Sequence, residues 1–185
     1  EFRRVLFRSK TYKNNMGTIK LLDGKIYDKN ALLKKMDNDD FYYGELNKLA
    51  LSSSSLKQVL SSPKTYNFSQ KYGSPESQAL RDGWLFHTAI LEPDVFKAQT
   101  FIDVQSKNTK KFKDAKLENP RVFTAKEKSS AERLADAFYR NEHALQLITN
   151  CNFEVPVIGE VQGKPFRGKA DVLAGDRIVD LKTTS

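Results

Sequence analysis

The sequence is poor in cysteine and contains no long apolar run, and both absences exclude whole classes of protein. Cys151 is its single cysteine, which excludes an intramolecular disulfide framework and any zinc site built from several cysteines. The longest apolar stretches, such as Trp84–Phe86 and Ala89–Leu91, are far too short to cross a bilayer. No secretory apolar segment follows the first residues. We therefore expect a protein of the reducing cytoplasm with no membrane association.

The composition fits a globular protein with a modest positive charge. The chain has 185 residues, of which 39% are hydrophobic and 29% charged, and this predicts one domain or part of one. The net charge is +8, and residues 1–15, with five basic side chains and one acidic side chain, supply half of it. The remaining charge of +4 permits a nucleic-acid partner without requiring one.

Both ends of the chain look unnatural. Glu1–Ser9 resembles a translated sequencing-library adapter, so we expect residues 1–15 to be non-native; a genuine basic arm is the alternative. At the other end a strand pattern runs directly into Ser185, which predicts that the C-terminal part of the domain is missing. We expect residues 16–50 to form an N-terminal extension and residues 51–185 to form the main domain.

A first helix is expected after a run of serines. Ser52–Ser55 offer N-cap residues, and the apolar side chains that follow have helical spacing. The predicted buried stripe consists of Leu56, Val59 and Leu60, and Pro63 would end the helix. A flexible serine linker is the alternative.

A second helix is expected from Ser74–Glu76, where serine, proline and an acid form a typical helix start, to about Leu91. Pro93 would prevent its continuation. His87 falls on or beside the buried face of this helix by helical spacing. Gly83 lies one turn earlier, and its missing side chain would leave room beside the imidazole. A hydrogen-bonded core histidine is the alternative to a ligand at this position.

A basic stretch and a long scaffold helix are expected next. Gln105–Arg121 is rich in lysine and turn-forming residues, so it is either a solvated loop or a surface that contacts phosphate. Thr124 and Glu127 have the spacing of a capping box, which would start a helix that continues through Ile148.

The apolar period then changes from that of a helix to that of a strand. Three strands are expected at Phe153–Val161, Pro165–Leu173 and Arg177–Lys182. Gly175-Asp176 has the composition of a two-residue hairpin loop between the last two strands.

This loop length would set Val172 opposite Val179 and Asp171 opposite Asp180, with Lys182 on the face that carries both acids. Directly opposed residues have Cβ atoms about 4.5–5.5 Å apart, so two buried carboxylates would repel each other. Lys182 would neutralise one charge, whereas a divalent cation would satisfy both acids and leave Lys182 for catalysis. Oxygen ligands without a cysteine cluster favour Mg²⁺, or Mn²⁺.

A third carboxylate is available on the preceding strand. We prefer Glu154 to Glu160, because Glu160 follows a glycine and lies near the end of the strand. The alternative for the whole region is a surface hairpin with an ordinary Asp–Lys ion pair.

The pattern of two aspartates across a hairpin and a lysine two residues later resembles the PD-(D/E)XK nuclease superfamily. More closely, the chain resembles the exodeoxyribonuclease VIII (RecE-type) domain of phage and prophage recombination systems over most of residues 51–185. The matching motifs, in order, are Leu51–Lys57 with Ser62-Pro63, Gly83–His87 with Leu91–Pro93, His143–Ile148, Glu154, Arg167–Asp171 and Ile178–Thr184.

The resemblance implies an α/β fold with a restriction-endonuclease-like core, in which N-terminal helices precede a sheet containing the hairpin. It implies that the cation is held by His87, Asp171, Asp180 and the carbonyl of Leu181. Lys182 would be the catalytic lysine, and Glu154 would be an additional catalytic acid beside Asp171 and Asp180. Ala170 departs from the superfamily pattern, which has proline there. The helix and strand that follow the lysine in the superfamily are absent.

The resemblance also implies an activity, namely Mg²⁺-dependent exonuclease degradation of double-stranded DNA ends in the 5′→3′ direction to expose 3′ single strands for recombination. A single-strand-annealing protein and a homo-oligomer are the expected partners. Lys164, Arg167 and Lys169 flank the strands and are expected to contact DNA phosphates. The alternatives are a non-catalytic DNA-end-binding subunit and an endonuclease of the same superfamily. The chain as given is expected to be poorly active.

Overall fold

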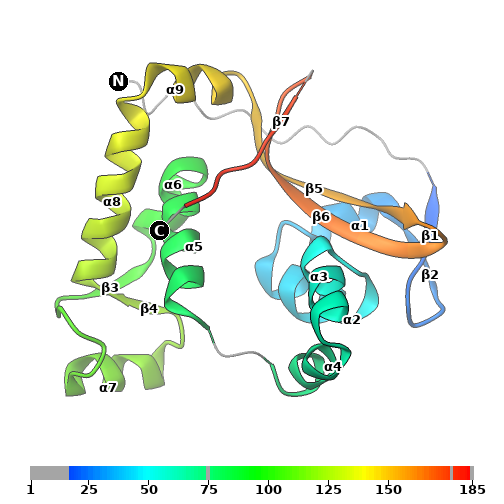
Figure 1. Cartoon of the computed structure of the whole chain (residues 1–185), viewed down its shortest axis with the longest axis horizontal. Helices are drawn as coiled ribbons and strands as arrows, with labels where there is room; N and C mark the ends of the chain where they lie inside the picture. The colour runs from blue at the N-terminus through cyan, green and yellow to red at the C-terminus, as the bar shows by residue number, and fades with distance from the viewer. Residues whose placement is uncertain (1–16, 74–75, 176, 184–185) are drawn as a thin grey trace.

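A long antiparallel hairpin joins two hydrophobic clusters of the chain (Figure 1). The computed structural model describes residues 17–73, 76–175 and 177–183, and residues 1–15, expected to be non-native, lie outside these ranges. Within the described ranges no helix is long and apolar enough to span a bilayer. The expected mixed α/β class is confirmed, although each sheet has only two or three strands in this part of the chain.

The N-terminal cluster comprises two strands and three helical segments. They are β1 (Thr18–Lys20), β2 (Ile26–Asp28), α1 (Lys29–Lys35), the π-helical turn η2 (Asp40–Glu45) and α2 (Leu46–Leu49). The two strands form an antiparallel hairpin, and the side chain of Asp28 caps α1. Their buried side chains pack with Ile158, so this segment docks on the long hairpin.

Helices α3 (Ser53–Ser61) and α4 (Pro63–Tyr72) follow as a helical pair, and each begins at a serine cap. Ser52 caps α3 through a capping box, which confirms the predicted role of the serines. Ser62 ends α3 and also caps α4, whose first position is Pro63.

The predicted buried stripe of α3 is wrong. Leu56 and Leu60 are exposed and Val59 is half-buried, whereas Ser55 is buried. The helix packs against α4, and among the described residues this contact leaves Leu56 and Leu60 exposed.

Helix α5 (Gln78–Leu91) begins later than predicted. Ser77, rather than a residue of 74–76, is its N-cap, since the Ser77 hydroxyl accepts a hydrogen bond from the amide three residues later at 3.2 Å. Residues 74 and 75 lie outside the described ranges. The predicted end at Leu91 is confirmed, and Pro93 starts the short helix α6 (Pro93–Lys97).

The basic stretch after α6 contains a helix. It forms α7 (Lys110–Glu118), capped by Thr109, so the loop interpretation of Gln105–Arg121 is wrong for its middle part. Strands β3 (Thr100–Ile102) and β4 (Val122–Thr124) flank α7 and pair in parallel.

The predicted scaffold helix is two helices, α8 (Ala125–Tyr139) and α9 (Glu142–Ile148). The capping box between Thr124 and Glu127 at the start of α8 is confirmed. Asn141 separates the two helices, because its Oδ1 accepts a hydrogen bond from an amide of the first turn of α9 at 3.1 Å and so caps a new helix.

The remaining strands form an antiparallel sheet in the order β5-β6-β7. They are β5 (Asn152–Val161), β6 (Lys164–Leu173) and β7 (Ile178–Val179). Val172 pairs with Val179, which confirms the predicted register. Strand β7 is shorter than predicted, because ladder pairing ends before residue 180. Val172 packs in the C-terminal cluster with α5 and α8, while Ile158 packs in the N-terminal one.

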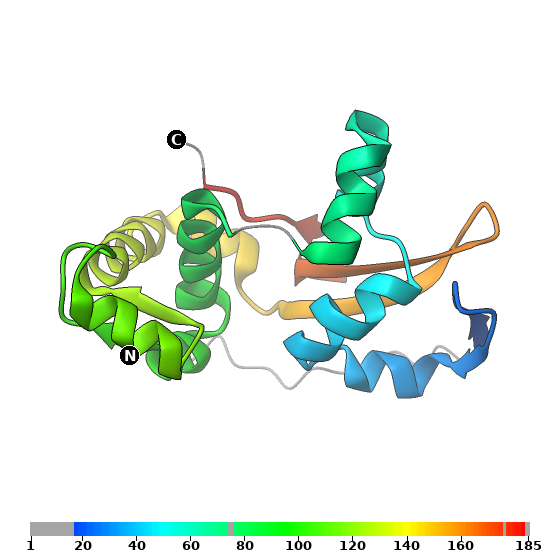
Figure 2. The ribbon, with the colours of Figure 1, turned by 90° about the horizontal axis from the view of Figure 1, so that it is seen from below.

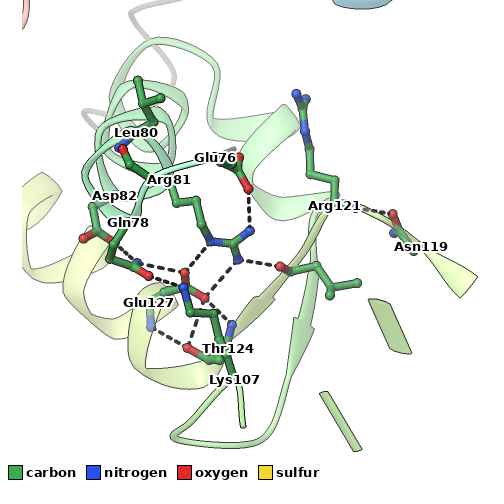
Figure 3. A network of polar contacts seen from close by, with 12 residues as sticks. Glu76, Gln78, Leu80, Arg81, Asp82, Lys107, Asn119, Arg121, Thr124 and Glu127 are labelled. Carbon is green, nitrogen blue, oxygen red and sulfur yellow. Dashed lines mark hydrogen bonds and ion pairs between the residues drawn. The ribbon is translucent and has the colours of Figure 1, made fainter. Parts of the chain in front are cut away.

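A buried ion pair ties α5 to α8 (Figure 3). Arg81 donates from Nε to Oε1 of Glu127 at 2.7 Å and from Nη2 to the carbonyl of Val122 at 2.6 Å. The other oxygen of Glu127 accepts from the amide of Thr124 at 2.8 Å. Burial alone would raise the pKa of Glu127, but the hydrogen bonds from Arg81 and Thr124 lower it to about 2.

Acid is expected to destabilise the fold through Glu127. The pKa of Glu127 in the folded chain, about 2, lies below its ordinary value of 4.5. The ionised carboxylate therefore contributes its full stabilisation when the pH is above 4.5. This contribution is lost as the pH falls from about 5 toward 2. We expect the free energy of unfolding, measured by urea denaturation at a series of pH values, to decrease over this range. Glu127→Gln should make the decrease less steep, and an identical pH dependence in that variant would contradict the expectation.

Candidate metal centre

The candidate centre starts from His87 on α5 and the backbone that follows β7. His87 is half-buried, with 27% of its side chain exposed. Its Nε2 lies 2.7 Å from the carbonyl oxygen of Leu181, a contact in which the Nε2–H tautomer of the ring would be the donor. That tautomer leaves the lone pair of Nδ1 without a proton, and Nδ1 lies 3.7 Å from Oδ2 of Asp171. Two acceptors then face each other across a gap that a cation would fill.

Asp171 holds the same backbone from strand β6. Its Oδ2 accepts a hydrogen bond from the amide of Leu181 at 2.8 Å, and 17% of its side chain is exposed. The chain after β7 is therefore fixed at one residue by His87 and Asp171, which contact its carbonyl and its amide. The Leu181 carbonyl, which the sequence analysis expected to be a ligand, contacts the ring of His87 in this structure.

Glu154 reaches the centre from strand β5 through an unusual backbone conformation. The pairs Phe153–Val172 and Val155–Ala170 flank it, so Glu154 stands opposite Asp171 in the register of the hairpin. Its φ is 49°, in the left-handed region that non-glycine residues seldom adopt. Such strain costs about 1–3 kcal/mol and is concentrated at functional sites. Glu160, the competing acid, is exposed and lies outside the cluster.

The three side chains form a cluster with the dimensions of a cation site. One ligand atom from each of His87, Glu154 and Asp171 lies within 4.8 Å of the other two. Octahedral ligands of Mg²⁺ at 2.0–2.1 Å lie about 3 Å apart when adjacent and about 4 Å apart when opposite. Two carboxylates, a carbonyl and one imidazole suit a hard or borderline cation such as Mg²⁺ or Mn²⁺. The donors therefore fit the cation that the hairpin pattern predicted.

Asp180 and Lys182 lie beside this cluster rather than in it. Lys182 Nζ is 2.6 Å from Oδ2 of Asp180, and the two side chains are 73% and 58% exposed. Among the described residues, the group of ligand atoms within 4.8 Å of one another does not include Asp180. The predicted meeting of Asp171 and Asp180 differs from the structure because the β6–β7 pairing stops at Val179 and the amide of Leu181 bonds the Asp171 carboxylate instead.

The ion pair stabilises the protonated form of Lys182. The hydrogen bond and the charge of Asp180, with a smaller contribution from Asp171, raise the pKa of Lys182 above its ordinary value. A lysine general base would need a lowered pKa. In this arrangement Lys182 is an ammonium group that can stabilise negative charge.

The three basic residues expected at DNA phosphates have different surroundings. Arg167 is buried, with its guanidinium over the ring of Tyr42 and its Nη2 donating to Asn47 at 2.6 Å. Lys169 forms an ion pair with Asp39 at 2.9 Å. Both therefore connect the hairpin to the N-terminal cluster, whereas Lys164 is exposed next to the β5–β6 turn.

Gly83 has a different role from the one expected. A Cβ built at this position would lie 3.8 Å from Oγ1 of Thr183. The space left by the missing side chain of Gly83 therefore lies next to Thr183. The sequence analysis expected this space to lie beside the imidazole of His87. Sequence reasoning missed Arg81, whose ion pair with Glu127 holds the helix that carries His87.

Comparison with known proteins identifies the family. Residues 52–185 match the model of the PDDEXK-like domain of unknown function (DUF3799). The chain belongs to this PDDEXK-like family. No curated protein and no solved structure gives a significant match. Membership associates the chain with the PD-(D/E)XK nucleases, which generally use divalent metals, and the cluster of His87, Glu154 and Asp171 agrees with such a centre.

Proposed function

We propose that the chain is a metal-dependent exodeoxyribonuclease that hydrolyses phosphodiester bonds at the ends of double-stranded DNA. The observation that carries the proposal is the convergence of His87, Glu154 and Asp171 at a strained point of a hairpin, within a PDDEXK-like domain. A protein that bound DNA without cleaving it would have no use for this arrangement, which is costly to maintain without a cation.

The residues of the centre have distinct roles in this proposal. His87, Glu154, Asp171 and the Leu181 carbonyl would hold Mg²⁺, or Mn²⁺, which when bound polarises a phosphate oxygen and lowers the pKa of a water molecule. Asp180 pairs with the ammonium of Lys182, which is exposed and so open to an incoming phosphate. The ammonium of Lys182 would stabilise the negative charge that develops on the phosphate during attack.

The finer assignment rests on the resemblance of the motifs to exodeoxyribonuclease VIII (RecE-type). That resemblance favours digestion in the 5′→3′ direction, a role in phage-type recombination, a neighbouring single-strand-annealing protein and a homo-oligomeric form. Lys164, exposed beside the β5–β6 turn, is the best placed of the three predicted phosphate contacts.

The proposal is tested with linear and covalently closed circular forms of one DNA. We expect Mg²⁺ to support release of nucleotides from the linear form and a chelator to stop it. The closed circle should remain intact, because an exonuclease needs an end. Nicking or linearisation of the circle would favour an endonuclease of the same superfamily. Binding of linear DNA without hydrolysis, with either metal, would contradict the proposed activity and favour the DNA-end-binding subunit.

A further inference from the structure

The helical pair α3–α4 exposes apolar side chains that the proposed centre does not use. On α4, Phe68 and Tyr72 are 61% and 65% exposed. Their ring centroids are 4.8 Å apart at an interplanar angle of 44°, as the i, i+4 spacing on a helix allows. Lys71 Nζ lies 5.3 Å from the centroid of the Tyr72 ring. We call Phe68, Lys71 and Tyr72 the aromatic face of α4.

This face is carried by a well-fixed helix. The hydroxyl of Ser62 accepts a hydrogen bond from the amide of Thr65 at 3.2 Å, and Pro63 occupies the first helical position. Ser69 donates to the side chain of Gln58 at 3.2 Å, which joins α4 to α3. The rings are therefore displayed on an ordered element rather than on a loose loop.

The stretch of sequence that carries the aromatic face has charged residues of one sign. Residues 46–75 contain no aspartate or glutamate, in a chain that has 23 of them. The same stretch contains four lysines, Lys48, Lys57, Lys64 and Lys71, and all four are exposed. Helices that expose aromatic rings together with lysines are complementary to a polyanion that has flat apolar groups.

We propose that the aromatic face of α4 binds an unpaired DNA strand, with bases stacked on Phe68 and Tyr72 and phosphates beside Lys64 and Lys71. The bases of a duplex are stacked on one another and cannot reach an aromatic ring, whereas those of a single strand can. In Figure 2 the teal-green helix of residues 63–72 and the red segment after β7 project on the same side of the β5–β6 hairpin. A strand held by α4 thus lies on the same side of the hairpin as the segment that follows β7. The identity of the strand as DNA rests on the proposed function.

The test is fluorescence anisotropy with a labelled single strand of about 20 nucleotides and with its blunt duplex, in EDTA so that nothing is cleaved. We expect Phe68→Ala and Tyr72→Ala each to weaken single-strand binding by about 10-fold, with little effect on the duplex. Lys71→Gln should reduce the slope of log affinity against log salt by about 0.7.

Leu117→Ala is the matched control, because Leu117 is an exposed apolar side chain on another basic helix, α7. The four positions are exposed, so thermal melts should match that of the wild type.

Three results would overturn the inference. The first is that removal of both rings leaves the affinity for the single strand unchanged. The second is that the ring variants lose affinity for the duplex and for the single strand equally. The third is that the ring variants change the oligomeric mass while their affinity for the single strand is unchanged. The last result would assign the face to a second copy of the chain. A wild-type chain that binds through α4 and hydrolyses nothing contradicts the proposed function alone.

Discussion

Replacing Asp171 with asparagine is expected to lower the Mg²⁺-dependent rate of nucleotide release from linear DNA by about 1,000-fold or more. The substitution removes the charge that the cation requires while it keeps an oxygen able to accept from the Leu181 amide, a contact of 2.8 Å in the wild type. Loss of a few kcal/mol of charge stabilisation corresponds to a rate change of this size. Initial rates at saturating Mg²⁺ measure it, and titration with Mn²⁺ followed by electron paramagnetic resonance reports the accompanying loss of metal affinity.

The matched control is Glu160→Gln. Glu160 is an acid on the same hairpin, but it is exposed and lies outside the cluster, so its replacement should leave the rate unchanged. Both variants should melt at the wild-type temperature. An Asp171→Asn protein that keeps the wild-type rate within about 3-fold would show that the cluster is not the reaction centre.

Replacing Arg81 with methionine is expected to lower the free energy of unfolding by about 3–5 kcal/mol. Methionine has a similar length, but it leaves the Glu127 carboxylate buried without its counter-ion and the carbonyl of Val122 without a donor. The cost comes from that uncompensated charge rather than from the ion pair itself. Urea denaturation at neutral pH measures it.

Arg133→Met is the control, because Arg133 lies on the exposed side of α8. It should change the free energy of unfolding by no more than about 0.5 kcal/mol. A double variant, Arg81→Met with Glu127→Leu, should recover part of the loss by removing the stranded charge, but not all of it, since Glu127 also caps α8. A loss below about 1 kcal/mol in Arg81→Met would mean that the pair does not hold α5 to α8.

Local signals in the sequence predicted local structure well. The capping box of Thr124 and Glu127, the serine cap of α3 and the register of Val172 with Val179 each depend on residues close together in the chain. In the hairpin the loop length determines the pairing, and no distant residue is needed to select it.

Predictions failed where an apolar pattern alone was used to infer burial or the length of a helix. The stripe of Leu56 and Leu60 identified an apolar face, but a periodic pattern carries no information on whether another element covers that face. The break at Asn141 was missed because a helical apolar pattern continues on both sides of it, while the side-chain cap that starts α9 is a weaker signal.

The predictions for the residues of the candidate site also succeeded in part and failed in part. Alternation along the strands selected Asp171 and Glu154, whereas helical spacing placed His87 only on or beside a buried face and the resemblance assigned it as a ligand. The structure brings these three side chains together. Asp180 was expected in the cluster because regular pairing was extended to residue 180. The bond from the Leu181 amide to Asp171 ends that pairing, and a contact between a side chain and the backbone has no signature in the pattern of strand residues.

The β5–β6 hairpin contributes residues to both hydrophobic clusters, and this has a consequence for the chain during its synthesis. Ile158 completes the N-terminal cluster, whose other buried members lie between Ile19 and Ala50. A ribosome that adds about 5–20 residues per second takes about 5–20 s to translate from Ala50 to Ile158. For those seconds the nascent chain carries the apolar side chains of its N-terminal segment uncovered, and chaperones that recognise such surfaces should occupy it until the hairpin emerges.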